Sequence, residues 1–137
     1  MKKYTLFALV SLFALCSSFD SYRLGGTAPS GCKPVLDGKV VTVLNLDTLL
    51  KWCETTPPVV QCDDGKKYSL NSFAVSFFTV KPLMNQDFGI GEGGIPIRAR
   101  EAAAKGHPGD ALVLKEVNAI GPKGEKVVFP VISLKIK

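Results

Sequence analysis

The sequence predicts an all-β domain, a sandwich of two sheets with one or two short helices. Two observations carry this prediction. The last third of the chain holds two runs of strand-forming residues, 111–119 and 126–136, on either side of a Gly-Pro-Lys-Gly turn. Residues 68–80 give the strongest strand signal outside that region, with apolar side chains on both faces. A strand with two apolar faces indicates the centre of a β-sandwich or a strand beside a partner surface.

The C-terminal hairpin follows from its turn chemistry. Pro122 sets φ at the first central position of the turn that begins at Gly121, and Gly124 can adopt the positive φ that a short hairpin loop requires. One parity of the second strand is apolar and is expected to face the core, whereas Ser133 and Lys135 lie on the other parity. The core-facing residues predicted in this way are Val128, Ile132, Leu134 and Ile136.

The first eighteen residues have the layout of a secretory signal peptide, with Lys2 and Lys3 before an apolar stretch at 4–16. That stretch has thirteen residues, whereas a membrane-spanning helix needs about 20. We therefore expect export to the periplasm or cell envelope and no transmembrane span. A lipid anchor on Cys16 is the less favoured alternative, because Leu15 is bulkier than the residue expected before an acylated cysteine.

After a signal peptide at 1–18, we expect a flexible leader at 19–36 and one domain at 37–137. Removing Lys2 and Lys3 lowers the formal net charge of the chain from +5 to +3. The remaining basic residues are spread along the sequence with acidic or apolar neighbours. Nucleic-acid binding is not expected, because it needs a dense basic face.

Upstream of the central strand, residues 39–44 form a β-branched run that predicts a strand. Asp47 is the expected N-cap of a short helix that carries Leu49 and Trp52. We interpret Trp52 as a core residue and not as a ligand-stacking one. Residues 57–62 are expected to form an edge strand.

The polar and glycine-rich segments suggest turns more than sites. Asp63, Asp64 and Gly65 predict a turn, because a calcium site needs more widely spaced oxygen ligands. Residues 88–94, FGIGEGG, lack the Lys and Ser/Thr of a phosphate-binding loop, so a mobile hairpin connection is expected there. Residues 95–105 predict a short helix. A surface turn follows, with His107, Gly109 and Asp110.

Three cysteines follow the predicted signal peptide, and none forms a close pair typical of zinc ligands. Cys53 and Cys62 enclose a short segment with two prolines, so a disulfide between them is slightly favoured over two reduced thiols. Cys32 is then left over, either free or paired between chains. Neither a metal nor another cofactor is expected.

Several of these residues resemble a known family. The similarity covers about residues 37–137, and its most specific part is the order Gly-Asp, strand, Ala-x-Gly-Pro-x-Gly, then a strand with Pro-x-Ile-Ser. The chain resembles the C-terminal domain of GldM, the gliding-motility and type IX secretion protein of Bacteroidetes. The resemblance implies an immunoglobulin-like β-sandwich that contacts partner proteins of a secretion and motility apparatus. The residues that carry it are Gly38, Leu70, Ser72, Phe73, Val75, Gly109, Asp110, Leu112, Val117, Ala119, Gly121, Pro122, Gly124, Pro130, Ile132, Ser133 and Lys135.

The predicted function is that of a non-catalytic interaction or assembly module that docks to envelope proteins. Loops on a rigid sandwich and apolar strand faces are where such domains meet partners. We expect the interface on the loops 82–96 and 106–110 and on the exposed parity of the strand at 68–80. The candidate interface residues are Phe78, Phe88, Ile90 and His107. A two-fold homodimer through an edge strand is compatible with the sequence, which does not specify it.

Two alternatives remain at this point. The chain could be a stand-alone secreted or lipid-anchored binding protein without a link to the secretion apparatus, since one fold serves many functions. The remote alternative is a small envelope hydrolase, for which His107 with Asp110 is the one conceivable pair, and no nucleophile pattern accompanies it.

Overall fold

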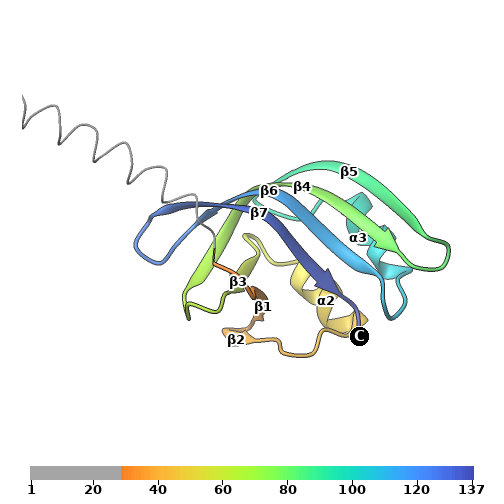
Figure 1. Cartoon of the computed structure of the whole chain (residues 1–137), viewed down its shortest axis with the longest axis horizontal. Helices are drawn as coiled ribbons and strands as arrows, with labels where there is room; N and C mark the ends of the chain where they lie inside the picture. Colours follow the sequence, from red (N-terminus) through yellow and green to blue (C-terminus); the bar gives the residue numbers. More distant parts are fainter. Residues whose placement is uncertain (1–28) are drawn as a thin grey trace, which may run out of the picture.

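The computed structural model describes residues 29–137 (Figure 1). The predicted signal peptide and residues 19–28 of the predicted leader lie outside the described residues. The described part is mostly β, with antiparallel strand pairs and two short helices, as the sequence predicts. The elements in chain order are β1 (Lys33–Leu36), β2 (Lys39–Val40), α2 (Leu46–Cys53), β3 (Val59–Gln61), β4 (Lys67–Thr79), β5 (Met84–Glu92), α3 (Ile97–Ala104), β6 (Ala111–Ile120) and β7 (Lys126–Lys135).

The strands are connected in one seven-stranded sheet around β4. Strand β6 pairs along one edge of β4, while β3 and β5 pair with the beginning and the end of its other edge. Strand β7 pairs with β6, and β1 follows β3. The sheet is curled, so that β1 and β2 lie across the core from β7 (Figure 1). The cross-section is therefore sandwich-like, and the two expected layers are parts of one connected sheet.

The β6–β7 hairpin forms where the turn residues predict it. The Gly124 N–H donates to the Gly121 carbonyl oxygen at 3.0 Å, and Gly124 has a φ of 79°. Glu125 supports the loop, because its carboxylate accepts from the Lys123 N–H at 2.9 Å. A residue with a side chain at Gly124 would pay the steric penalty of positive φ.

The buried parity changes halfway along the hairpin, which corrects one sequence-based expectation. Val128, expected in the core with Ile132, is 46% exposed, whereas the neighbouring Phe129 is only 2% exposed. Strand β6 changes parity at the same level, next to Glu116, which has a φ of 50°. The physical reason lies at Pro130, since proline has no N–H for the ladder and is tolerated in edge strands or irregularities. A prediction that assumes strict alternation of buried and exposed residues along the strand does not account for this change of parity.

The two helices cover the buried face of the sheet. Trp52 of α2 is fully buried, and its indole N–H donates to the Val59 carbonyl oxygen at 2.9 Å. This geometry confirms its interpretation as a core residue. The cap differs from the expected one, because the Asn45 side chain, not that of Asp47, accepts the Thr48 N–H at 2.8 Å. Helix α3 agrees with the predicted helix at 95–105.

The N-terminal strands correct two further predictions. Residues 39–44 were expected to form one strand, but only Lys39–Val40 is a strand. Strand β1, Lys33–Leu36, lies inside the stretch 19–36 that was expected to be a flexible leader. The turn explains strand β1, because Asp37 and Gly38 have positive φ values of 52° and 76° and join β1 to β2 in a two-residue hairpin. Asp-Gly between apolar runs is a strong signal for such a turn.

Strand β5 corrects the prediction of a mobile connection at residues 88–94. Met84–Glu92 is a strand that pairs with β4 from Thr79 back to Ser72, with an irregularity between Ala74 and Ser76. The glycines of β5 lower its strand propensity, since Gly is depleted in strands, and this is why the sequence did not predict it. Gly91 requires the absence of a side chain, because a Cβ there would lie 2.6 Å from the Phe73 ring.

Candidate protein-interaction surface

The four predicted interface residues do not lie together. Phe88 lines a groove between β5 and α3, on the face that also buries Phe77. Successive strand residues point to opposite faces, so Phe78 lies on the other face of the sheet. Ile90 pairs with Ala74, which shares the parity of Phe78, and is 71% exposed.

His107, the fourth of them, is exposed in the turn between α3 and β6. The predicted set is therefore divided between two faces of the sheet and this turn.

A groove lies beside Phe88, one of the predicted interface residues. It has a volume of about 330 Å³ and lies between the β4–β5 hairpin and α3. Its walls combine apolar side chains, including Phe77, Met84 and Phe88, with charged side chains from α3. The full lining is Phe77, Thr79, Met84, Gln86, Phe88, Arg98, Glu101, Ala102 and Lys105.

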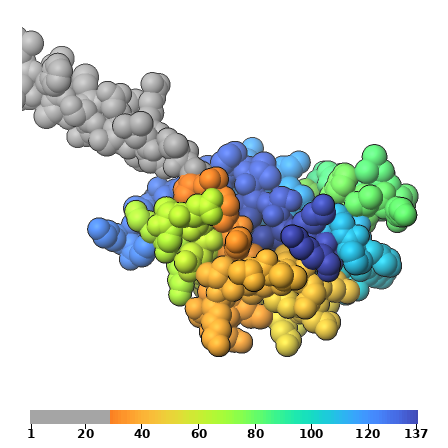
Figure 2. Space-filling model, turned by 60° about the horizontal axis from the view of Figure 1, so that its bottom comes forward, coloured from red at the N-terminus to blue at the C-terminus, as the bar shows by residue number. Residues whose placement is uncertain are grey.

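The tip of the β4–β5 hairpin continues the apolar character of this groove. Val80, Leu83 and Met84 are 43%, 76% and 48% exposed. The tip is ordered by Thr79, whose hydroxyl donates to the Pro82 carbonyl oxygen at 2.7 Å. We call the hairpin tip (residues 80–84) together with the groove against α3 the hairpin end. Figure 2 shows the hairpin in green beside α3 in cyan at one end of the molecule.

Asp110 fixes the turn that borders the hairpin end. It is only 4% exposed, and its two carboxylate oxygens accept from the Val80 N–H at 3.0 Å and the His107 N–H at 2.8 Å. Gly109 adopts a φ of 98° and donates its N–H to the Ile136 carbonyl oxygen. The carboxylate therefore joins the start of the hairpin tip to the α3–β6 turn, which agrees with the predicted structural role of Gly109 and Asp110.

The same hydrogen bonds show how Asp110 and His107, the pair considered for a hydrolase, are related in the structure. Both Asp110 oxygens are engaged by backbone N–H groups, so the carboxylate's hydrogen bond to His107 goes to the main chain. The imidazole orientation that a catalytic Asp–His pair requires comes from a bond to the ring nitrogen. The geometry thus gives Asp110 a turn-stabilising task.

The rim of the hairpin end is predominantly basic. Lys81 at the tip, Arg98 on α3 and Lys105 directly after α3 are exposed, whereas Glu101 is the acidic side chain among the lining residues of the groove. Apolar walls with a positive rim are complementary to an apolar segment that carries acidic side chains.

The cysteines correct the predicted disulfide. Cys32 is bonded to Cys62, and Cys53 is a free, buried thiol in α2. The residue left over in the sequence interpretation is therefore one of the partners. Burial raises the pKa of the Cys53 thiol to about 12, partly opposed by the positive charge of Arg100. A thiol with so high a pKa is a poor nucleophile at neutral pH.

The predicted interface loop at 82–96 contains Leu83 and Met84, the most exposed apolar residues of the hairpin end, although neither was singled out. The basic residues on and after α3 were not predicted to take part. A turn signal was present in Lys81-Pro82, but only the pairing of β5 with β4 brings this turn beside α3. The residue pattern within the hairpin or within α3 does not indicate that the two lie side by side.

No protein-family model matches the chain, and no curated protein is significantly similar to it. Within residues 29–137, no helix is long and apolar enough to cross a membrane.

Proposed function

We propose that this protein is an exported, non-catalytic interaction module that binds a partner protein through the hairpin end. The observation that carries the proposal is the continuity of the exposed apolar tip with the groove against α3. Exposed apolar patches with polar rims are typical of protein-interaction sites. The Cys32–Cys62 disulfide supports an oxidising compartment, such as the periplasm or another extracytoplasmic space.

The resemblance to the C-terminal domain of GldM extends the proposal to the partner's class. We propose an immunoglobulin-like sandwich that docks to envelope components of type IX secretion or gliding motility. The sandwich-like cross-section of the curled sheet supports this view of the fold. The hairpin end supplies a surface on which such docking could occur.

Site-specific photocrosslinking in the source cell tests the hairpin end directly. A photoreactive amino acid replaces Leu83, which is 76% exposed, and in a matched control it replaces Val43, which is 62% exposed in the β2–α2 connection. We expect a discrete crosslinked partner from position 83 and not from position 43. Equal crosslinking from both positions, or none from position 83, would refute the hairpin end as the interface.

Charge reversal then tests the basic rim. Lys105→Glu combined with Arg98→Glu should weaken capture of the crosslinked partner, while Lys126→Glu on β7 should leave it unchanged. Mass spectrometry of the crosslinked protein decides its class. An envelope component of the secretion or motility apparatus supports an assembly role, whereas a partner of another class supports a stand-alone binding protein. A crosslink to a second copy of the chain would instead indicate a homodimer.

A further inference from the structure

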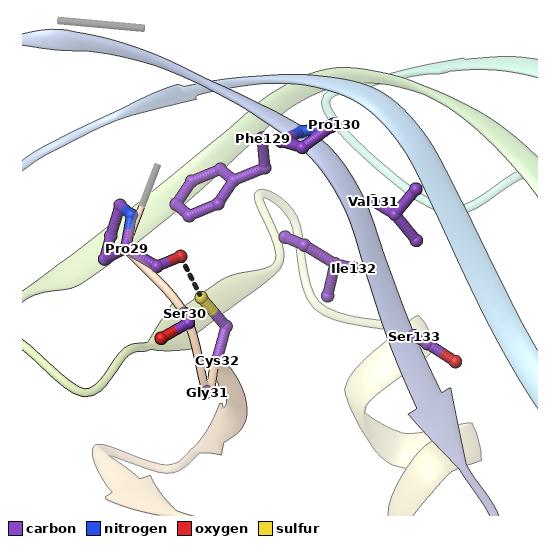
Figure 3. A pocket seen from close by; sticks show the side chains of 9 residues that line it. All are labelled: Pro29, Ser30, Gly31, Cys32, Phe129, Pro130, Val131, Ile132 and Ser133. Atoms are coloured by element: carbon purple, nitrogen blue, oxygen red, sulfur yellow. Dashed lines mark hydrogen bonds between the residues drawn. The ribbon is translucent and has the colours of Figure 1, made fainter. Parts of the chain in front are cut away.

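A second cavity lies beside the free edge of β7, away from the hairpin end. It has a volume of about 410 Å³ and separates the segment just before β1 from β7 (Figure 3). Residues 29–32 line one wall and residues 129–133 line the other. The cavity falls within the size range of pockets that hold ligands, roughly 300–1,000 Å³.

One wall is an edge strand, and the other is an irregular segment with a bend at Ser30 and a φ of 64° at Gly31. Strand β7 pairs only with β6 among the described residues, so its other edge has no strand partner there. The opposite wall pairs on its far side, because the Ser30 carbonyl oxygen accepts from the Asp63 N–H at 3.0 Å and Lys33 is paired with Gln61. Within residues 29–137, no backbone hydrogen bond joins the two walls.

The floor of the cavity is apolar. Phe129 and Ile132 are 2% and 4% exposed, and Figure 3 shows their side chains pointing toward residues 29–32. Val131 and Ser133 point away from that wall. An occupant would therefore meet apolar surface below it and free backbone groups at its sides.

Covalent and hydrogen-bonded contacts hold the outer wall in place. Cys32 lines the cavity and is bonded to Cys62, which directly follows β3. The Ser30–Asp63 hydrogen bond is a second attachment to the same segment. The Cys32 Sγ also lies 3.8 Å from the Pro29 carbonyl oxygen, the contact drawn in Figure 3, and this is a van der Waals contact because a disulfide sulfur carries no hydrogen. The cavity is thus formed before any ligand arrives.

We propose that this cavity is a strand-addition site for a single extended peptide of a partner protein. Such a peptide would add to the free edge of β7 through main-chain hydrogen bonds, the mode known as β-augmentation. It would place alternate, small apolar side chains on Phe129 and Ile132, since successive strand residues point to opposite sides.

The outer wall argues for a single peptide and against a second folded copy. A second copy would bring an edge strand flanked by its own sheet, and residues 29–32 stand where that sheet would have to pass. The edge is also guarded by Lys126, Pro130 and Lys135, which are exposed and of the kinds that discourage unlimited edge pairing. A thin, extended segment avoids the clash with residues 29–32, and Pro130 withholds only one main-chain hydrogen bond from it.

The test is to select binders from a displayed library of short random peptides on the whole oxidised protein. We then map the best synthetic peptide by amide hydrogen exchange and NMR. We expect slowed exchange and shifted resonances at residues 129–133 and 29–32. Cys32→Ser with Cys62→Ser should weaken peptide binding by roughly tenfold, because a released wall forfeits one or two hydrogen bonds to the peptide.

A second variant keeps the proposal testable if the cysteine variant fails to fold. Pro130→Ala restores a backbone N–H on the edge strand, and we expect it to strengthen peptide binding several-fold. Failure to select any peptide, protection that maps elsewhere, or affinities unchanged by the variants that fold would overturn the proposal. Concentration-dependent dimerisation through β7, seen by analytical ultracentrifugation, would also overturn it. None of these outcomes depends on the hairpin end.

Discussion

Removal of the Cys32–Cys62 disulfide is expected to cost a large share of the folding free energy. The bridge joins residues 30 apart in the sequence, and the chain-entropy relation for a loop of that length gives about 3.5 kcal/mol at 25 °C. A domain of this size has a total stability of about 5–15 kcal/mol. The Cys32→Ser, Cys62→Ser variant should therefore unfold at clearly lower urea concentration than the wild-type protein.

The matched control is Cys53→Ala, which removes a buried sulfur atom and no crosslink. Its cost should be about 1 kcal/mol, the range for a small deletion in a core. Equilibrium urea denaturation, monitored by Trp52 fluorescence under oxidising conditions, measures both variants. Peptide mapping without reduction identifies the linked cysteines directly. The reasoning is refuted if Cys53 is found in the bridge, or if the double variant is as stable as the wild-type protein.

Three further predictions concern ionisable groups. Burial, with the hydrogen bond to Asp64, raises the pKa of Tyr68 to about 12. The neutral phenol therefore favours the folded state, and this stabilisation is lost as pH rises from about 10 to 12. Tyrosinate absorbance of the folded and the denatured protein should show the difference in pKa, and titration of Tyr68 near 10 in the folded protein would contradict it. The Cys53 thiol should resist alkylation at pH 8 until the protein unfolds, as mass spectrometry of modified peptides would reveal. Asp110→Ala should destabilise the fold by about 2–4 kcal/mol, because it leaves the Val80 and His107 N–H groups without their acceptor. Thermal denaturation measures this loss, with Asp87→Ala at an exposed position as the control. Equal midpoints for the two variants would show that the Asp110 carboxylate is not needed.

The sequence was most informative where a local rule acts alone. The β6–β7 hairpin was predictable because Pro122 and Gly124 have the φ preferences that its turn demands, whatever the rest of the chain does. Strand β4 was predictable because its apolar side chains occupy both parities and leave few other structures open to it. Trp52 was assigned to the core because a large apolar side chain on a short amphipathic helix is rarely left in water.

Errors arose where two local signals competed. The Asp37-Gly38 turn signal was not used and the β-branched run after it was interpreted as one strand, so the β1–β2 hairpin was missed. The glycines of β5 favoured a loop by propensity, although pairing with β4 compensates for their poor strand preference. At Pro130, simple alternation was extended through an irregularity that the proline itself could have indicated.

By itself, the sequence determined that the described chain would be mostly antiparallel β, where its main hairpin turns, and that Trp52 would lie in the core. Tertiary structure alone decided that Cys62 faces Cys32 and not Cys53, that Phe88 borders α3 while Phe78 lies on the opposite face, and that a cavity separates β7 from residues 29–32. The physical reason is the range of the interactions. Turn preferences and alternation act over a few neighbouring residues, whereas disulfide partners, grooves and free edges depend on which distant segments the curled sheet brings side by side.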